Sequence, residues 1–260
     1  MIFIDSKAKT LLCYMPIVIC LLSLMSPIVQ ANHPSHSNKL SVLTEQWFPF
    51  NYKNADGDIV GSNTEAVHEI MTLSQLPYEI YIHNWKNALL QTQRDSNTLL
   101  FTIFKTPERE QKFHWLCPIS TKITNSFYAL SNRDISINSL EELKQYSVAI
   151  TEESYPQHLL IESGFVVGEN LQLVSTNDNS IERLLRKRVD IIVETENAIN
   201  TELAEKSIAR NTVKKVYSLD YDKQLDACMA INKNVNPETL KKLKQAHQQW
   251  LKRNPQISSK

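Results

Sequence analysis

An arginine occupies an unfavourable helix position in the stretch KTPEREQKFHW, residues 105–115. Thr106 has the character of an N-cap residue and Pro107 that of a first helical residue, which places Arg109 in the first turn. A positive charge there lies at the positive end of the helix dipole and costs from a few tenths to about 1 kcal/mol. A guanidinium beside free helix N–H groups would form a site for an anion such as a carboxylate. The alternative is an ordinary surface arginine paired with one of its glutamate neighbours.

The other residue patterns give no catalytic or cofactor motif. The chain has only 4 glycines, and none lies in the GxGxxG or GxxxxGK patterns that hold phosphates. GxSxG, HExxH and CxxC are also missing from the sequence. His33 and His36, in NHPSHSN, are interpreted as part of a polar linker rather than as metal ligands. We therefore expect no metal, no cofactor and no enzymatic activity.

The first 31 residues have the pattern of a secretory signal peptide. Lys7 and Lys9 precede an apolar run over residues 11–29, and Val-Gln-Ala ends the segment with a small-residue cleavage site. An uncleaved membrane anchor is the alternative, although two prolines and two serines interrupt the run. The pattern predicts a protein exported to the periplasm, with residues 32–39 as a linker after the cleavage site.

The balance of charges excludes some partners. The chain has 28 Lys and Arg against 28 Asp and Glu, without a basic block. This balance gives no electrostatic reason to expect nucleic acid or a membrane surface as a partner. Cys117 and Cys228 are the cysteines that remain after the predicted cleavage. In an oxidising compartment they could form one disulfide, and two buried free thiols fit the sequence about as well.

The order of the predicted elements indicates two α/β units. The first contains strands over 40–43, 78–82 and 98–103, helices over 64–73 and 85–92, and a turn at 54–57. The second contains strands over 126–130, 147–150, 171–174, 189–193 and 213–217, and helices that begin at Ser139 and cover 154–163, 181–188 and 196–209. A turn at 220–223, a strand over 228–231 and a helix capped by Asn236 and Pro237 complete the chain. Such alternation predicts mostly parallel sheets in two lobes of about a hundred residues each, with a small-molecule site in the cleft between them.

Several segments of the sequence resemble those of a known family, the extracellular solute-binding proteins of family 3. The resemblance is carried by TEQWFPFNY (44–52), GSNTEAVHEIM (61–71), NWKNAL (84–89), FTIFKTPERE (101–110), SLEELKQYSVAI (139–150) and RKRVDIIVET (186–195). It implies the type II periplasmic binding protein (Venus-flytrap) fold: two Rossmann-like α/β lobes joined by hinge strands. The implied first lobe covers 40–122 and 220–260, and the second covers 123–219.

The resemblance also implies a ligand site. Arg109 would bind the ligand's α-carboxylate as a bidentate pair. The residues implied around it are Thr102 before the motif, Trp47 and Phe50 after the first strand, Ser62 and Asn63 before the first helix, and Ser154 and Tyr155 at a helix start in the second lobe. For both aromatic residues, ordinary core packing is the alternative. Trp85 and Lys86 are interpreted as a packed aromatic residue beside an exposed lysine.

Several positions depart from the family pattern. Thr195 stands where amino-acid receptors place an aspartate for the ligand's ammonium group, and Glu194 is next to it. Alternation along a strand prevents the assumption that Glu194 takes over this role, and Thr195 could be only an N-cap. Phe104 replaces a small residue near the cleft. Either another acid, Glu45 or Glu153, binds the ammonium group, or the ligand has no α-amine.

The resemblance implies that Cys117 and Cys228 lie on adjacent strands, where a disulfide is feasible. The function it implies is a monomeric periplasmic receptor for a small carboxylate, an amino acid or an analogue, which delivers its ligand to the membrane permease of an ABC transporter. Two alternatives remain from the same fold: a periplasmic lyase or dehydratase that acts on a carboxylate, and a ligand-sensing co-receptor for a signalling protein.

Overall fold

The computed structural model describes residues 39–258 except 176 and 220–225. The described residues belong to one compact unit. The predicted signal peptide, the pair His33 and His36, and the predicted turn at 220–223 lie outside them. Within the described part of the chain, no helix is long and apolar enough to span a membrane.

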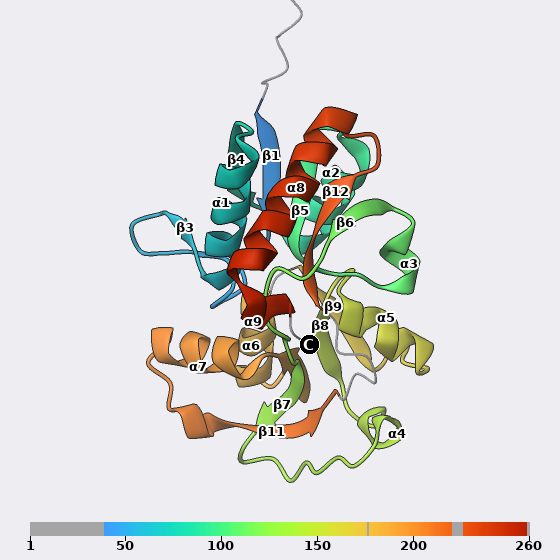
Figure 1. The fold of residues 1–260 in the computed structure, drawn as a ribbon. Coiled ribbons are helices and arrows are strands. Elements are labelled where there is room, and N and C mark those ends of the chain that lie inside the picture. Colours follow the sequence, from blue (N-terminus) through green and yellow to red (C-terminus); the bar gives the residue numbers. More distant parts are fainter. Residues whose placement is uncertain (1–38, 176, 220–225, 259–260) are drawn as a thin grey trace, which may run out of the picture. The chain divides into compact units, whose positions relative to one another are not determined.

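The first sheet has the strand order β4-β1-β5-β12-β6 (Figure 1). Its strands are β1 (Leu40–Thr44), β4 (Tyr78–Ile82), β5 (Thr98–Phe104), β6 (Phe113–Leu116) and β12 (Ala227–Asn232). β1 is parallel to β4 and β5, while β12 is antiparallel to β5 and β6. Every residue of β5 and β12 is buried, as expected for central strands that helices cover on both faces. We call this sheet and its helices the first lobe.

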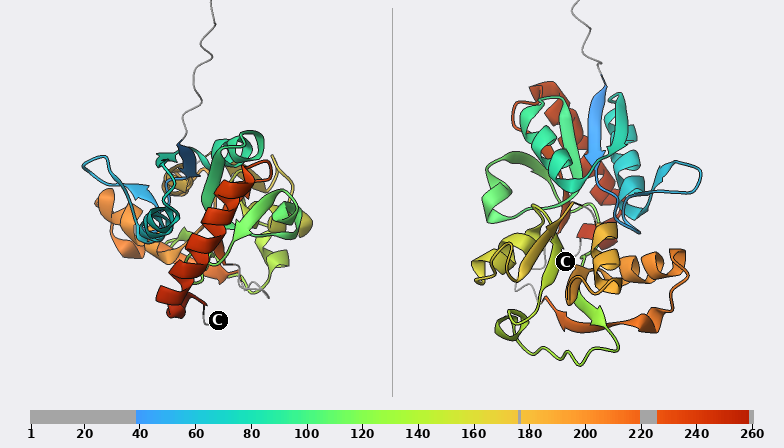
Figure 2. Two further views of the ribbon diagram at one scale, coloured as in Figure 1. Left: turned by 45° about the horizontal axis from the view of Figure 1, so that its top comes forward. Right: turned by 180° about the vertical axis from the view of Figure 1, so that it is seen from behind.

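The helices of the first lobe are α1 (Ser62–Ser74), α2 (Trp85–Arg94), α3 (Pro107–Glu110), α8 (Pro237–Arg253) and α9 (Pro255–Ser258). A hairpin of β2 (Tyr52–Lys53) and β3 (Ile59–Val60) surrounds the predicted turn at 54–57. α8 lies beside α1, and Figure 2 shows it across the first sheet. Its apolar face buries Leu243, Ala246 and Trp250, and the Trp250 indole donates to Glu69 on α1 at 2.7 Å.

The second sheet has the order β11-β7-β10-β8-β9. Its strands are β7 (Ser126–Leu130), β8 (Val148–Thr151), β9 (Leu171–Val174), β10 (Ile191–Glu194) and β11 (Val213–Ser218). Its helices are α4 (Leu140–Leu143), α5 (Tyr155–Glu162), α6 (Asn177–Leu185) and α7 (Glu196–Glu205), with a 3-10 turn at Arg210–Thr212. We call this sheet and its helices the second lobe. The two mixed α/β lobes confirm the predicted fold class. The prediction of mostly parallel sheets is wrong, because β12 is antiparallel to β5 and β6 in the first sheet, and β7 is antiparallel to β10 and β11 in the second.

Two connections join the lobes. The first, residues 117–125, contains no strand, and the second includes residues outside the described part of the chain. The amide of Leu219 donates to the carbonyl of Asn125, which brings the two connections together at one point. The exact limits of the two lobes stay a prediction.

Four of the N-cap residues expected from the sequence cap helices in the structure. The side chains of Ser139, Ser154, Thr195 and Asn236 each accept a hydrogen bond from a backbone amide of the following helix. Thr106 is the N-cap residue of α3, but its side chain makes no capping hydrogen bond. Sequence reasoning missed β6 and the strands of the hairpin, because such short segments are specified by their partners rather than by their own pattern.

Other predicted bounds need correction. α6 begins at Asn177, four residues before the predicted start, and α7 ends at Glu205 instead of 209. After α7 the backbone of Ser207 is left-handed, with φ of 54°, which ends the helical run before the 3-10 turn that leads into β11.

A disulfide joins Cys117 and Cys228, with a Cα–Cα distance of 4.5 Å. Cys117 follows β6 and Cys228 lies in β12, its neighbour in the first sheet. The bond therefore connects the residue after β6 to the adjacent strand β12, across a sequence separation of 111 residues. The structure selects the bridge over the two free thiols that the sequence left open.

Candidate ligand-binding site

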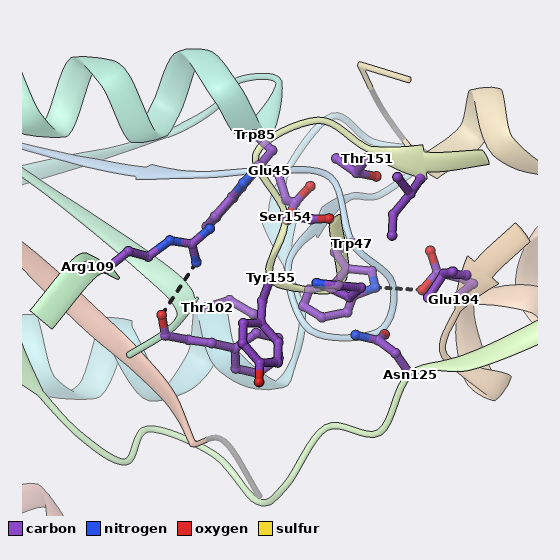
Figure 3. A pocket seen from close by; sticks show the side chains of 14 residues that line it. Glu45, Trp47, Trp85, Thr102, Arg109, Asn125, Thr151, Ser154, Tyr155 and Glu194 are labelled. Carbon is purple, nitrogen blue, oxygen red and sulfur yellow. Dashed lines mark hydrogen bonds between the residues drawn. The ribbon is translucent and has the colours of Figure 1, made fainter. Parts of the chain in front are cut away.

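A pocket lies between the two lobes and has a cavity volume of about 50 Å³ (Figure 3). The first lobe lines it with Glu45, Trp47, Trp85, Thr102, Phe104 and Arg109, and the second with Ile150, Thr151, Ser154, Tyr155, Pro156, Val193 and Glu194. Asn125, on the connection between the lobes, completes the lining. The volume is far below the ~300 Å³ at the lower end of small-molecule sites. Admission of a ligand therefore requires the lobes to separate or side chains to move.

Arg109 is the cationic residue of this pocket. Its side chain is 4% exposed, and its guanidinium lies over the Trp85 ring at 5.3 Å from the centroid. Nη2 donates to the carbonyl of Glu153 at 2.5 Å, and Nη1 donates to that of Phe104 at 3.4 Å. The other guanidinium N–H groups have no acceptor among the described residues and remain able to bind a carboxylate.

Burial lowers the pKa of Arg109 to about 10, although the charges of Glu153, Glu108 and Glu45 oppose the shift. The group is therefore still a cation at neutral pH. The alternative of a surface arginine does not fit, because Arg109 is buried and Glu110 pairs with Lys105 at 2.7 Å. α3 has only 4 residues, so the expected contribution of its helix dipole is small and the guanidinium itself must provide the anion site.

The loop between β8 and α5 faces Arg109 from the second lobe. The backbone of Glu153 is left-handed, with φ of 62°, and its carbonyl accepts from both Arg109 and the Trp85 indole, the latter at 2.8 Å. Lys86 pairs with Glu152 at 2.8 Å beside these contacts. Trp85 and Lys86, interpreted from sequence as a packed ring and an exposed lysine, thus connect the lobes. A left-handed non-glycine residue is uncommon, and it turns this carbonyl toward the first lobe.

Glu194 is the buried carboxylate of the pocket, with 4% exposure. Its Oε1 accepts from the Trp47 indole at 2.9 Å and from the Thr195 amide at 2.6 Å. Thr195 instead caps α7, since its Oγ1 accepts from the Ala198 amide at 3.2 Å. Alternation at the end of β10 therefore directs Glu194 into the pocket and Thr195 away from it.

Glu45 follows β1 and places a second carboxyl group in the pocket from the first lobe. Burial raises its pKa to about 8, and the charge of Glu194 adds to this shift while Arg109 opposes it. The Glu45 side chain was only one of two sequence candidates for an ammonium partner. Because its pKa is so high, this carboxyl group is mostly protonated at neutral pH.

Aromatic rings form one wall of the pocket. Trp47 contacts Phe104 with ring centroids 6.2 Å apart, and Phe104 contacts Tyr155 of the second lobe at 6.4 Å. Phe50 packs against Trp47 at 5.1 Å and does not line the pocket itself. The rings of Trp47, Phe104 and Tyr155 would cover the apolar part of a ligand.

Thr102 lies on β5 with a left-handed φ of 60°, which is strained for a β-branched residue. Its Oγ1 accepts from Asn63 Nδ2 at 3.1 Å, so Asn63 supports the pocket from behind. The preceding Gly61 has φ of 125°, and a Cβ there would lie 2.5 Å from the Phe50 carbonyl oxygen. Only glycine fits this close approach, which positions Ser62 and Asn63 at the start of α1.

Most of the residues predicted from sequence meet in this pocket. Seven line it: Trp47, Thr102, Phe104, Arg109, Ser154, Tyr155 and Glu194. Phe50, Ser62, Asn63 and Thr195 do not. Sequence reasoning missed Asn125 and Thr151, and it gave Trp85 no role in the cleft. These three residues reach the pocket only because of the way the two lobes meet, and a single sequence has no local signal for that.

Two α/β lobes with a charged pocket between them define the architecture of a periplasmic binding protein of type II. The family model of the bacterial extracellular solute-binding proteins, family 3, matches residues 40–256. The chain therefore belongs to this family. A comparison with curated protein sequences gives no match.

Solved structures share the fold. An ancestral arginine-binding protein bound to arginine is 20% identical, with a TM-score of 0.71, and the match covers 85% of this chain and 96% of that one. A histidine kinase sensor domain with similarity to periplasmic binding proteins is 17% identical, with a TM-score of 0.72, and covers 85% and 93%. The arginine-, lysine-, histidine-binding protein ArtJ from Geobacillus stearothermophilus is 19% identical, with a TM-score of 0.66, and covers 85% and 96%. At these identities the likeness extends to the fold alone.

Proposed function

We propose that the chain is a receptor for a small α-amino acid or a close analogue. One observation carries the proposal: a buried guanidinium, Arg109, and a buried carboxylate, Glu194, line the same pocket from opposite lobes. Arg109 would bind the ligand's carboxylate, and Glu194 would bind its ammonium group. The ligand would then connect the two lobes through its own two charges.

The contacts between the lobes support this polarity. Trp47, Trp85, Lys86 and Arg109 of the first lobe each donate a hydrogen bond to an acceptor in the second. A zwitterion with its carboxylate toward the first lobe and its ammonium group toward the second fits this arrangement, because the carboxylate meets donors and the ammonium group meets acceptors. An amine-free carboxylate would leave the Glu194 charge without a cationic partner from the ligand, which is costly in a buried site.

The small cavity supports a binding cycle with hinge motion. With a volume of about 50 Å³, the pocket needs an opening of the lobes before an amino acid can enter. The two connections are the natural place for this motion, since each sheet lies within one lobe, and the disulfide ties only the first residue of the first connection, Cys117, to β12. Ligand binding would then stabilise the arrangement in which the four donors reach their acceptors.

The proposal also includes a cellular setting. The protein would be exported to the periplasm, act as a monomer and deliver its ligand to the membrane permease of an ABC transporter. Membership of an extracellular solute-binding family and the arginine-binding neighbours support this setting. Co-purification of the periplasmic protein with a permease, enhanced by ligand, tests the partner.

A thermal-shift screen of the mature protein tests the ligand class. The panel contains amino acids, their amine-free analogues, dicarboxylates and keto or hydroxy acids. A ligand at a hundred times its Kd adds about 2.7 kcal/mol, which raises the Tm of a chain of this size by roughly 5–10 °C. Amino acids are expected to raise the Tm of the wild type and not that of Arg109→Ala. The matched control Arg94→Ala, an exposed arginine that pairs with Asp95, should respond as the wild type does.

One observation favours a second candidate, a lyase or dehydratase of the same fold. Such an enzyme needs an acid in the cleft whose pKa lies near neutrality, and the pKa of Glu45 is about 8. NMR of candidate hydroxy acids incubated with the pure protein decides between the two. Turnover that Glu45→Gln abolishes would replace the receptor proposal.

A further inference from the structure

Two acids face one pocket from opposite lobes. Glu45 follows β1 in the first lobe, and Glu194 ends β10 in the second. Figure 3 shows both among the side chains of the pocket, together with Arg109, the single cation among the described residues that line it. The charges of Glu194 and Arg109 act on Glu45 in opposite directions.

The pocket's charges do not balance when both acids are ionised. Arg109 then contributes one positive charge against two negative ones, and a neutral zwitterion leaves the sum at minus one. An uncompensated charge away from water is expensive, so the site gains from one more positive charge. Either a proton on one of the acids or a second positive group on the ligand can supply it.

The contacts indicate which acid carries the proton. Glu194 accepts hydrogen bonds from Trp47 and Thr195, both N–H donors to one carboxylate oxygen. For Glu45, the hydrogen bonds of the described residues include none to its carboxyl group, and only its backbone carbonyl accepts, from Asn51 at 2.7 Å. The proton therefore belongs on Glu45, in agreement with its pKa of about 8.

Apart from the two acids, no described residue of the lining competes for this proton near neutral pH. Burial raises the pKa of Tyr155, so its phenol on α5 stays neutral. Arg109 on α3 stays charged because its pKa is about 10. Of the remaining polar lining residues in the described chain, Thr102, Asn125, Thr151 and Ser154 do not titrate.

We propose that Glu45 adapts the charge of the pocket to the ligand by keeping or releasing one proton. Beside a neutral amino acid, Glu45 stays protonated while Arg109 and Glu194 bind the ligand's carboxylate and ammonium group. A cationic amino acid brings a second positive group; the Glu45 O–H bond then breaks, the proton passes to the buffer, and the carboxylate pairs with that group. This inference rests on the proposed receptor function and adds to it the class of ligand that Glu45 selects.

Isothermal titration calorimetry at pH 7, in two buffers of different ionisation enthalpy, measures the protons released. The probes are L-arginine and L-lysine as cationic amino acids and L-glutamine and L-alanine as neutral ones. A pKa of about 8 predicts release of about 0.9 proton with a cationic probe and close to none with a neutral one. The Kd of the cationic probe should fall about tenfold from pH 6 to pH 7 and level off above pH 8. The Kd of a neutral probe should stay nearly constant from pH 6 to pH 7 and rise above pH 8, where the free site loses the proton that this complex keeps.

Glu45→Gln retains the shape of the protonated side chain and cannot ionise. Thermal unfolding verifies that the variant is folded. It should bind a cationic probe at least tenfold more weakly than the wild type at pH 8, without proton release and without the pH dependence. The control Glu205→Gln changes an exposed glutamate at the end of α7 and should behave as the wild type in every titration.

The outcomes separate this inference from the proposed function. If no amino acid of the panel binds to the folded wild type, the receptor proposal fails and this inference fails with it. If cationic amino acids bind without proton release, or if none binds at any pH while neutral ones do, the receptor proposal stands and the role of Glu45 is wrong. If Glu45→Gln keeps the proton release, another group carries the proton.

Discussion

The two lobes face each other with different chemistry. The first presents N–H donors from long side chains, Trp47, Trp85, Lys86 and Arg109, whereas the second presents oxygen acceptors. These acceptors are two carboxylates and one backbone carbonyl, the latter from the left-handed Glu153. The difference teaches that recognition of a zwitterion requires no symmetry between the lobes: one lobe binds the anion and the other binds the cation.

The lobes also differ in their covalent constraint. A disulfide joins β12 to the segment after β6 in the first lobe, and no disulfide involves the described residues of the second. The cross-linked lobe also supplies the guanidinium and the strained Thr102.

Removal of the disulfide should have the largest effect on stability. Cys117→Ser with Cys228→Ser opens a loop whose ends are 111 residues apart, and the loop-entropy model predicts a loss of about 3–5 kcal/mol of unfolding free energy. Urea denaturation of the oxidised wild type and the double variant measures the loss. An equal midpoint for both proteins would mean that the bridge does not constrain the chain.

Arg109→Ala removes the guanidinium with which the first lobe would bind the ligand's carboxylate. We expect amino-acid affinity to fall by about 2–5 kcal/mol, or roughly 30- to 4000-fold, because the ligand's carboxylate loses its charged partner in a buried site. Calorimetry measures the loss. Arg109→Lys keeps the positive charge without the paired N–H geometry, so its affinity should lie between those of the wild type and Arg109→Ala. Wild-type affinity in Arg109→Ala would place the carboxylate elsewhere.

Trp47→Phe keeps an aromatic ring in the wall and deletes the donor to Glu194. Loss of one N–H donor to a buried carboxylate is expected to cost about 1.5–3 kcal/mol of unfolding free energy. Trp115→Phe is the matched control, since its indole donates to the backbone carbonyl of Glu110 at an exposed site. A larger loss in the control would show that indole deletion, rather than the cross-lobe contact, determines stability.

The Lys86–Glu152 pair should contribute least of the cross-lobe contacts. Its side chains are 44% and 33% exposed, so water and salt screen the attraction. A double-mutant cycle with Lys86→Ala and Glu152→Ala is expected to give a coupling of about 0.2–1 kcal/mol in ligand affinity, reduced at high salt. A coupling well above this range would show that the pair contributes substantially to holding the lobes together around the ligand.

The sequence specified local structure well where a single side chain carries the signal. Thr195 and Asn236 were recognisable as caps because a cap needs only its own helix. The motif around Arg109 likewise indicated an unusual arginine, which proved to be buried in the cleft. The two lobes followed from the alternation of strands and helices.

What the sequence did not specify depends on contacts between distant residues. Glu194 could be assigned to the pocket only after the end of β10 was known to one residue, since a shift by one reverses the side chain. The left-handed Glu153 has no glycine to signal it. The role of Trp85 requires a carbonyl 68 residues further along the chain, in the other lobe. Local patterns carry no information on such pairings.

In the proposed complex, the ligand's carboxylate binds Arg109 of the first lobe while its ammonium group binds Glu194 of the second. The most direct measurement is a calorimetric cycle with one amino acid that binds, its analogue without the α-ammonium group, the wild type and Glu194→Gln. We expect loss of the ammonium group to weaken binding to the wild type by at least tenfold, and binding to Glu194→Gln far less. If the amine-free analogue binds the wild type as tightly as the amino acid does, the account is contradicted and Glu194 does not recognise the ligand's amine.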